Sequence, residues 1–177
     1  MDFLDIIHTR RSIRKFACDP VSPELIEKIL RAGMASPTAT NSQSWRFIIV
    51  DNRDTLNEIA RIHPYAKPAA DAPLAIVVCG DTSAGHAPEF WPQDAAAAVQ
   101  TMMLAARSLE LGSLWCGIHP HTGREDAFIR LLGIPGSVRP FALLIIGYPL
   151  QPFTHEDRFD EAVLSLAVDK LNDMAYS

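Results

Sequence analysis

The chain has 177 residues, about one domain's worth, and 48% of them are apolar, which is ample for a packed core. Its net charge of −5 argues against nucleic acid or an anionic membrane as a general partner, and no apolar run is long enough to span a bilayer. Three widely spaced cysteines and an acidic N-terminal segment indicate neither a disulfide framework, nor a paired-cysteine metal site, nor a signal peptide, so we expect a reduced, cytoplasmic protein.

The first chemical signal is a cluster of cations on this acidic chain. Residues 2–9 have the apolar pattern of a short helix, and it is followed directly by Arg10, Arg11, Arg14 and Lys15. The cluster is either a solvated basic patch or a site for a bound anion. Guanidinium groups bind phosphate through paired, charge-assisted hydrogen bonds and stay ionised at any working pH, so the second interpretation predicts a phosphate ligand.

A second helix and a polar loop come next. Ser22 as N-cap and Pro23 at the first helical position predict a helix that ends near Gly33. Residues 35–44 are small, polar and free of charge, which indicates a loop. Their hydroxyl and amide side chains suit a ligand that carries hydroxyl and carbonyl groups.

The strand signals are apolar runs bounded by turn-forming residues. They cover residues 45–50, 74–79, 114–118 and 141–146. The second and fourth runs are apolar throughout, so helices should cover both faces of the sheet. With a short helix predicted over 54–62, strands and helices are intermixed, and no repeat or long linker divides the chain. This pattern predicts one domain of α/β type.

The most apolar helix of the chain is predicted to begin at Asp94, as its N-cap, and to stop at Gly112. Small residues near its start allow close approach of neighbours. The helix is therefore either the core helix of a monomer or one that also packs against a second subunit. The preceding loop contains three ring side chains that are either walls of a substrate cavity or a cover for the sheet: His86, Phe90 and Trp91.

Signals for backbone access and helix ends follow this helix. At Gly117 the missing side chain would let backbone N–H groups approach a planar ligand closely. Thr122 and Glu125 fit a capping box for a further helix, with Gly133 as its stop. A polar loop and a last amphipathic helix over 161–174 complete the expected elements.

Several common catalytic motifs are missing from the sequence. No G-x-G-x-x-G follows a strand, no P-loop is present, and no G-x-S-x-G nucleophile turn occurs. His119, His121 and Cys116 lie close enough in sequence to hold a metal, but no H-E-x-x-H or paired cysteine supports that role. Surface or hydrogen-bonded histidines are the interpretation that we prefer, and we expect no metal.

Four motifs follow one another along the chain: R-R-S-x-R at 10–14, S-P-T-x-x-N-S-Q-x-W at 36–45, D-A-A-A-A-V-Q-T-M-M-L-A-A at 94–106 and L-x-L-G-S-x-W-C-G at 109–117. G-Y-P at 147–149 and then Arg158 come after them. This series resembles the FMN-dependent nitroreductase family over essentially the whole chain. The resemblance implies an α+β fold of three layers, α/β/α, with a mainly antiparallel central sheet covered by helices. It also implies a single flavin-binding domain over residues 1–177 and an intertwined homodimer with FMN at the subunit interface.

The resemblance implies a composite cofactor site. The phosphate and ribityl chain of FMN would be held by residues of the cationic segment and one residue of the tail: Arg10, Arg11, Ser12, Arg14 and Arg158. The ring and ribityl chain would be lined by loop residues of the partner subunit: Pro37, Thr38 and Asn41. Backbone groups near flavin N5 would come from one further segment: Cys116, Gly117 and Ile118.

The resemblance also implies an activity. NAD(P)H would reduce the flavin at N5, and a nitroaromatic, quinone or similar acceptor would then be reduced in a ping-pong mechanism, with no catalytic side chain required. Two alternatives stay open. Related scaffolds carry out reductive dehalogenation, enone reduction or flavin breakdown, and a flavin-binding protein without turnover could be a sensor or carrier.

Overall fold

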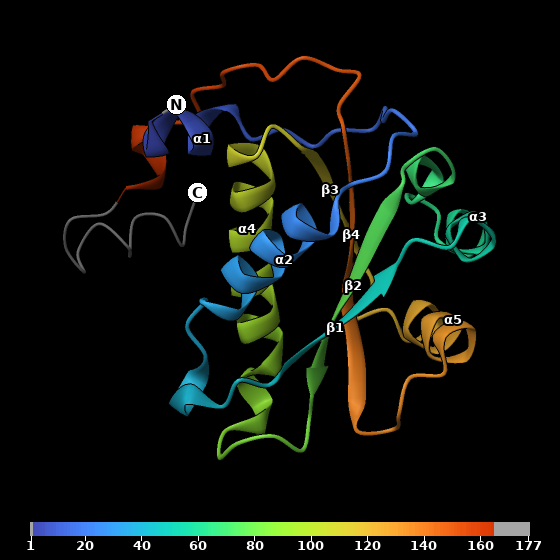
Figure 1. Ribbon diagram of the computed structural model, residues 1–177. Coiled ribbons are helices and arrows are strands. Elements are labelled where there is room, and N and C mark those ends of the chain that lie inside the picture. Colours follow the sequence, from blue (N-terminus) through green and yellow to red (C-terminus); the bar gives the residue numbers. More distant parts are fainter. Residues whose placement is uncertain (1, 165–177) are drawn as a thin grey trace.

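The computed structural model describes residues 2–164, and within them four strands form one antiparallel sheet in the order β1-β2-β4-β3 (Figure 1). The strands are β1 Trp45–Val50, β2 Leu74–Asp81, β3 Gly112–Gly117 and β4 Val138–Gly147. Each pair of neighbours is antiparallel, as the predicted fold requires. β2 and β4 are central, whereas β3 lies at an edge of the sheet.

Helices cover both faces of this sheet, which confirms the predicted three layers. Figure 1 shows α2 and α4 on one face and α3 and α5 on the other. The α-helices of the described residues are α1 Phe3–Thr9, α2 Pro23–Met34, α3 Arg53–Ile62, α4 Trp91–Ser108 and α5 Thr122–Leu132. Short 3-10 turns lie at η1 Ala39–Asn41, η2 Lys67–Ala70, η3 Pro88–Phe90 and η4 Glu161–Val163.

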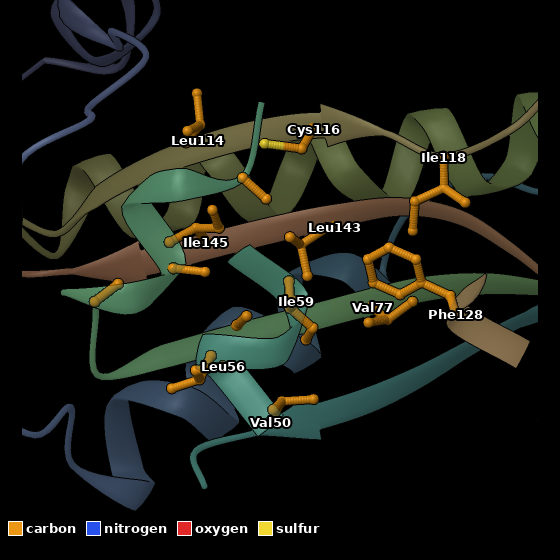
Figure 2. Packing of buried hydrophobic residues seen from close by; sticks show 14 of the residues in the cluster. Val50, Leu56, Ile59, Val77, Leu114, Cys116, Ile118, Phe128, Leu143 and Ile145 are labelled. Atoms are coloured by element: carbon orange, nitrogen blue, oxygen red, sulfur yellow. The ribbon is translucent and has the colours of Figure 1, made fainter. Parts of the chain in front are cut away.

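The central strands are buried on both faces, as their continuous apolar sequences predict. In β2, Ala75 and Val77 belong to the core beneath α3 and α5, whereas Leu74 and Ile76 belong to the core beneath α2 and α4. This alternation follows from the two-residue period of a strand. Figure 2 shows the first core, with Phe128 of α5 among the strand residues.

The start of α2 and the end of α5 lie where the local sequence predicts them. The Ser22 hydroxyl accepts a hydrogen bond from Leu25 N at 3.4 Å, and α2 begins at Pro23. Gly133 ends α5 in the left-handed conformation, with φ of 63°. These positions depend only on nearby backbone, so the sequence was sufficient to find them.

Three predicted helix ends were wrong. α4 begins at Trp91, inside the predicted loop, so Asp94 lies in its first turn instead of capping it. The left-handed residue after α4 is Glu110, with φ of 61°, and Gly112 is already the first residue of β3. Thr122 is the first residue of α5, and Glu125 bonds to His119 in place of a capping box.

α1 lies beside the C-terminal half of α4 and near the segment that follows β4 (Figure 1). Arg107, in the last turn of α4, connects these parts. Its Nε donates to Thr9 Oγ1 at 3.0 Å, and its guanidinium lies 3.9 Å from the centroid of the Phe153 ring. α4 therefore fixes the position from which the cationic segment starts.

The predicted helix over 161–174 falls mostly on residues outside those described. Its first three residues form the 3-10 turn η4, and Leu164 after them has extended backbone. Across residues 2–164, no helix has both the length and the apolar character needed to cross a bilayer.

Candidate functional site

The cationic segment and the tail come together around one cavity. It has a volume of about 310 Å³ and is lined by Ile7, His8, Arg10, Arg11, Glu156, Asp157, Arg158 and Phe159. Arg10, the C-cap of α1, is half-buried. Burial and the nearby charges of Arg11 and Arg158 lower the pKa of the Arg10 guanidinium. The structure thus brings together three of the predicted phosphate ligands.

One carboxylate already binds two of these cations. Glu156 Oε2 accepts hydrogen bonds from Arg158 Nη2 at 2.7 Å and Nε at 3.1 Å, and it also pairs with Arg11. Within residues 2–164, Arg10 forms no ion pair of its own. The cavity therefore keeps an excess of positive charge, and its geometry is suited to an anion with several oxygens.

Ser12 and Arg14 are placed by the residue between them. Ile13 is buried, and its N–H donates to Ser113 O on β3 at 3.0 Å. Side chains alternate in extended backbone, so burial of Ile13 turns Ser12 and Arg14 outward. The N–H groups of Arg14 and Lys15 donate to Gln151 Oε1 at 2.6 and 3.0 Å, which fixes this segment to the tail.

The open edge of β3 presents one backbone N–H at the predicted ring contact. Gly117 pairs opposite Ala142, and Ile118 N donates to Phe141 O at 3.0 Å. Along an antiparallel strand, the backbone N–H groups of successive residues point to opposite sides. Because Ile118 N–H points toward β4, Gly117 N–H points away from it. A Cβ added to Gly117 would meet no atom within 4 Å. Cys116 faces the core, and burial raises its pKa to about 11.

Two residues that sequence reasoning missed hold the Gly117 peptide. Its carbonyl accepts from His63 Nε2 and from Arg124 Nη1, both at 2.9 Å. Tyr65 N donates to His63 Nδ1 at 3.2 Å, so the ring carries its proton on Nε2. Burial lowers the pKa of His63 and keeps the ring neutral.

The predicted loop ligands are shaped by Asp94. This buried carboxylate accepts from Ala39 N at 2.8 Å and from the hydroxyls of Ser42 and Ser44 at 2.9 Å each. The Thr38 hydroxyl accepts from Gln43 N at 3.1 Å. Two of the predicted loop ligands are exposed and the third is half-buried: Pro37, Asn41 and Thr38.

One chain does not bring this loop to the arginines. Asp94 lies near the start of α4 and Arg107 near its end, which at 1.5 Å per residue separates them by about 20 Å. The loop is bonded to Asp94, whereas Arg10 directly follows the Thr9 that bonds to Arg107. In Figure 1, α1 and the turn around residue 40 lie at opposite ends of α4.

The other candidate side chains have structural neighbours. Trp91 is buried, with its ring centroid 4.8 Å from that of His119, while Phe90 and His86 are exposed. His119 Nδ1 lies 2.8 Å from Glu125 Oε1. No group of three or more potential metal-ligating side chains gathers within the described part of the chain. Of the three ring side chains expected either to line a substrate cavity or to cover the sheet, the buried Trp91 covers the sheet.

The sequence model of the Nitroreductase family matches residues 7–71 and 63–148. The chain belongs to the nitroreductase family. The match includes the cationic segment, the polar loop and the β3 edge, whereas Arg158 lies beyond the matched residues.

Three proteins illustrate how this nitroreductase-family chain compares with others. One from Methanothermobacter thermautotrophicus, provisionally named NADH dehydrogenase/NAD(P)H nitroreductase, is 46% identical over 160 residues, covering 90% of this chain and 84% of its own. A structure from Clostridium acetobutylicum, provisionally named an NADH oxidase, is 36% identical with a TM-score of 0.89, and the match covers 92% of this chain and 98% of that chain. A provisionally named nitroreductase of Desulfovibrio desulfuricans, solved in complex with FMN, is 31% identical with a TM-score of 0.80, covering 94% and 96%.

These similarities confirm the predicted family, the α+β nitroreductase fold and the enzyme class of a nitroreductase-type oxidoreductase. The names of the relatives include FMN and NAD(P)H, the two cofactors that the sequence predicts. The individual site residues remain predictions, which the geometry above makes more specific.

Proposed function

We propose that this protein is an FMN-dependent oxidoreductase that uses NAD(P)H to reduce a nitroaromatic, quinone or similar small acceptor. The observation that carries the proposal is the positively charged cavity around Arg10, in a nitroreductase-family chain whose open β3 edge lies beside the same segment. When bound, FMN supplies hydride transfer at N5, first as acceptor and then as donor.

The phosphate end of FMN fits the charged cavity. Arg10, Arg11 and Arg158 surround it, and Glu156 shows that a pair of guanidiniums there can bind one anion. The outward positions of Ser12 and Arg14 add a hydroxyl and a cation beside β3. These residues would bind the phosphate and the start of the ribityl chain through charge-assisted hydrogen bonds.

The ring end fits the β3 edge. Gly117 leaves space over its Cα and directs an N–H outward, so it can donate to a polar atom of a planar ring. His63 and Arg124 hold the following peptide and so fix the direction of this edge. Cys116 and Ile118 form the adjoining backbone. The proposed reaction asks no side chain to transfer a proton.

The remaining part of the site would come from a second subunit. Pro37, Thr38 and Asn41 lie about 20 Å away from the cluster of the same chain, along α4. α1 buries none of its residues, and Phe3 is 61% exposed beside an apolar groove between α1, α2 and α4. An intertwined homodimer would cover this surface and bring the loop of one subunit to the arginines of the other.

The proposed organisation extends to the whole chain. We propose that residues 1–177 form one flavin-binding domain and that the protein acts in the cytoplasm. Free thiols at Cys18, Cys79 and Cys116 agree with a reducing compartment.

The test begins with the absorption spectrum of the purified protein and titration with FMN. We expect a flavin band at about 450 nm, anaerobic bleaching by NADH or NADPH, recovery on addition of a nitroaromatic or quinone, and a dimeric mass. A colourless protein that takes up no FMN would refute the proposal. Bound flavin that NAD(P)H does not reduce would favour a carrier, and recovery only with halogenated or enone substrates would favour the related reactions.

A further inference from the structure

We infer that Asp94 is a positioning residue that fixes the loop over residues 38–44 in the shape required by the flavin site of the partner subunit. The inference rests on the proposed function, because it concerns the part of the FMN site that a second subunit would supply. Asp94 itself is buried in α4 and would not touch the cofactor.

The contacts of Asp94 are unusually complete for one side chain. Only 4% of the residue is exposed, and its two oxygens accept from a backbone N–H and from two hydroxyls, all within 2.9 Å. A buried carboxylate needs such donors to offset the loss of water. Its place in the first turn of α4 adds the favourable field of a helix N-terminus.

The loop that Asp94 holds has unusual backbone. Thr40, Asn41 and Gln43 have φ of 53°, 55° and 48°, in the left-handed region that residues with side chains rarely adopt. The donors to Asp94 lie at Ala39 and Ser42, on either side of Asn41, with Ser44 after Gln43. The strained residues are therefore held between bonds to a single carboxylate, and they include an exposed proposed FMN ligand.

The consequence is an effect between subunits. Loss of the Asp94 carboxylate would let residues 39–44 relax, and the Asn41 of that chain would leave the site of its partner. The arginines of the same chain would remain in place, because they are held at the other end of α4. A merely structural role would lower stability without this pattern.

The first experiment measures the dissociation constant for FMN by flavin fluorescence, with the melting temperature of the apoprotein as a check of folding. We expect Asp94→Ala to weaken FMN binding at least tenfold and Asp94→Asn, which keeps one acceptor, to be intermediate. Ser42→Ala, which removes a single donor and leaves the core intact, should weaken binding a few-fold. Thr55→Ala is the matched control, because its hydroxyl also donates to a side-chain oxygen, that of Asn52, at the start of α3 on the opposite face of the sheet.

The second experiment tests the direction of the effect. Chains with Asp94→Ala and chains with Arg10→Ala and Arg14→Ala are co-expressed with different tags, and the heterodimer is isolated. One of its two sites then combines intact arginines with an intact loop. At an FMN concentration that nearly fills the wild type and leaves each variant homodimer largely empty, we therefore expect the heterodimer to bind about half as much FMN as the wild type.

Each outcome decides the inference. Wild-type FMN affinity in both Asp94→Ala and Ser42→Ala, or an empty heterodimer of folded chains, would overturn it. Failure of the wild type to bind FMN would instead refute the proposed function and the inference with it.

Discussion

Ile13 lies directly against Gly112. A Cβ at Gly112 would stand 2.9 Å from three side-chain carbons of Ile13, closer than packed carbon atoms allow. Ile13 is 1% exposed and lies between Ser12 and Arg14. The absent side chain of Gly112 is therefore what lets the cationic segment approach β3.

Gly112→Ala should displace Ile13 and disturb both stability and cofactor binding. Overpacking of this kind costs roughly 1–3 kcal/mol in the free energy of unfolding, and we expect a weaker affinity for FMN as well. Urea unfolding and an FMN titration check both effects. Gly123→Ala is the control, because an added Cβ there meets no atom within 4 Å. Equal behaviour of the two variants would show that the contact with Ile13 is unimportant.

Replacing Arg10 and Arg14 together by alanine should yield a folded protein that lacks FMN. A hydrogen bond to a charged group contributes roughly 1.5–3 kcal/mol, so two losses predict a dissociation constant raised by roughly two to four orders of magnitude. Flavin content after purification and an FMN titration measure this. Alanine at Arg31 and Arg61, which pair with neighbours on exposed helix surfaces, controls for net charge. Full FMN occupancy in the double variant would exclude the phosphate role.

Glu156→Gln should strengthen FMN binding a few-fold at low ionic strength. The bonds from Arg158 and Arg11 hold the pKa of Glu156 below its usual range, so its carboxylate is charged and competes with an incoming phosphate. Because the pair is exposed to solvent, the gain should shrink as salt is added. Glu89→Gln makes the same change in charge at an exposed position in η3. An unchanged affinity at every salt concentration would show that Glu156 does not compete.

His63 should make the protein less stable in mild acid. Burial lowers the pKa of folded His63 below 6.5, the ordinary value that the unfolded chain regains, so the unfolded state binds the proton first as the pH falls. The stabilisation is complete above about pH 6.5 and is lost progressively below it. We expect the variant His63→Asn, which keeps an amide donor but does not titrate, to have a flatter dependence of melting temperature on pH. Parallel curves between about pH 5 and pH 7 would contradict this.

Local signals predicted much of the fold. Ser22 with Pro23 and the left-handed Gly133 act through adjacent backbone, and the apolar runs of β2 and β4 reflect burial on both faces. Aspartate and glycine are common at helix ends, which is why the sequence predicts caps at Asp94 and Gly112. In the structure, however, Asp94 binds Ser44 and Gly112 packs against Ile13, and both partners are distant in sequence. No local pattern contains that information.

The candidate site divides in the same way. The arginines could be found because they are close together in the sequence. The role of His63 could not be predicted, because its hydrogen bond to the Gly117 carbonyl joins residues 54 positions apart in the sequence. Glu156 was equally hidden, because only the return of the tail to α1 makes it a partner of Arg11.

The two ends of α4 restrict how this protein can change in length. An insertion of one residue between Asp94 and Arg107 would turn one end of the helix by about 100° relative to the other. The Asp94 carboxylate and the Arg107 guanidinium could then no longer both face their partners, Ser44 and Thr9. Insertions and deletions compatible with both contacts must therefore fall in the connecting loops, outside the helical phase that this pair of residues sets.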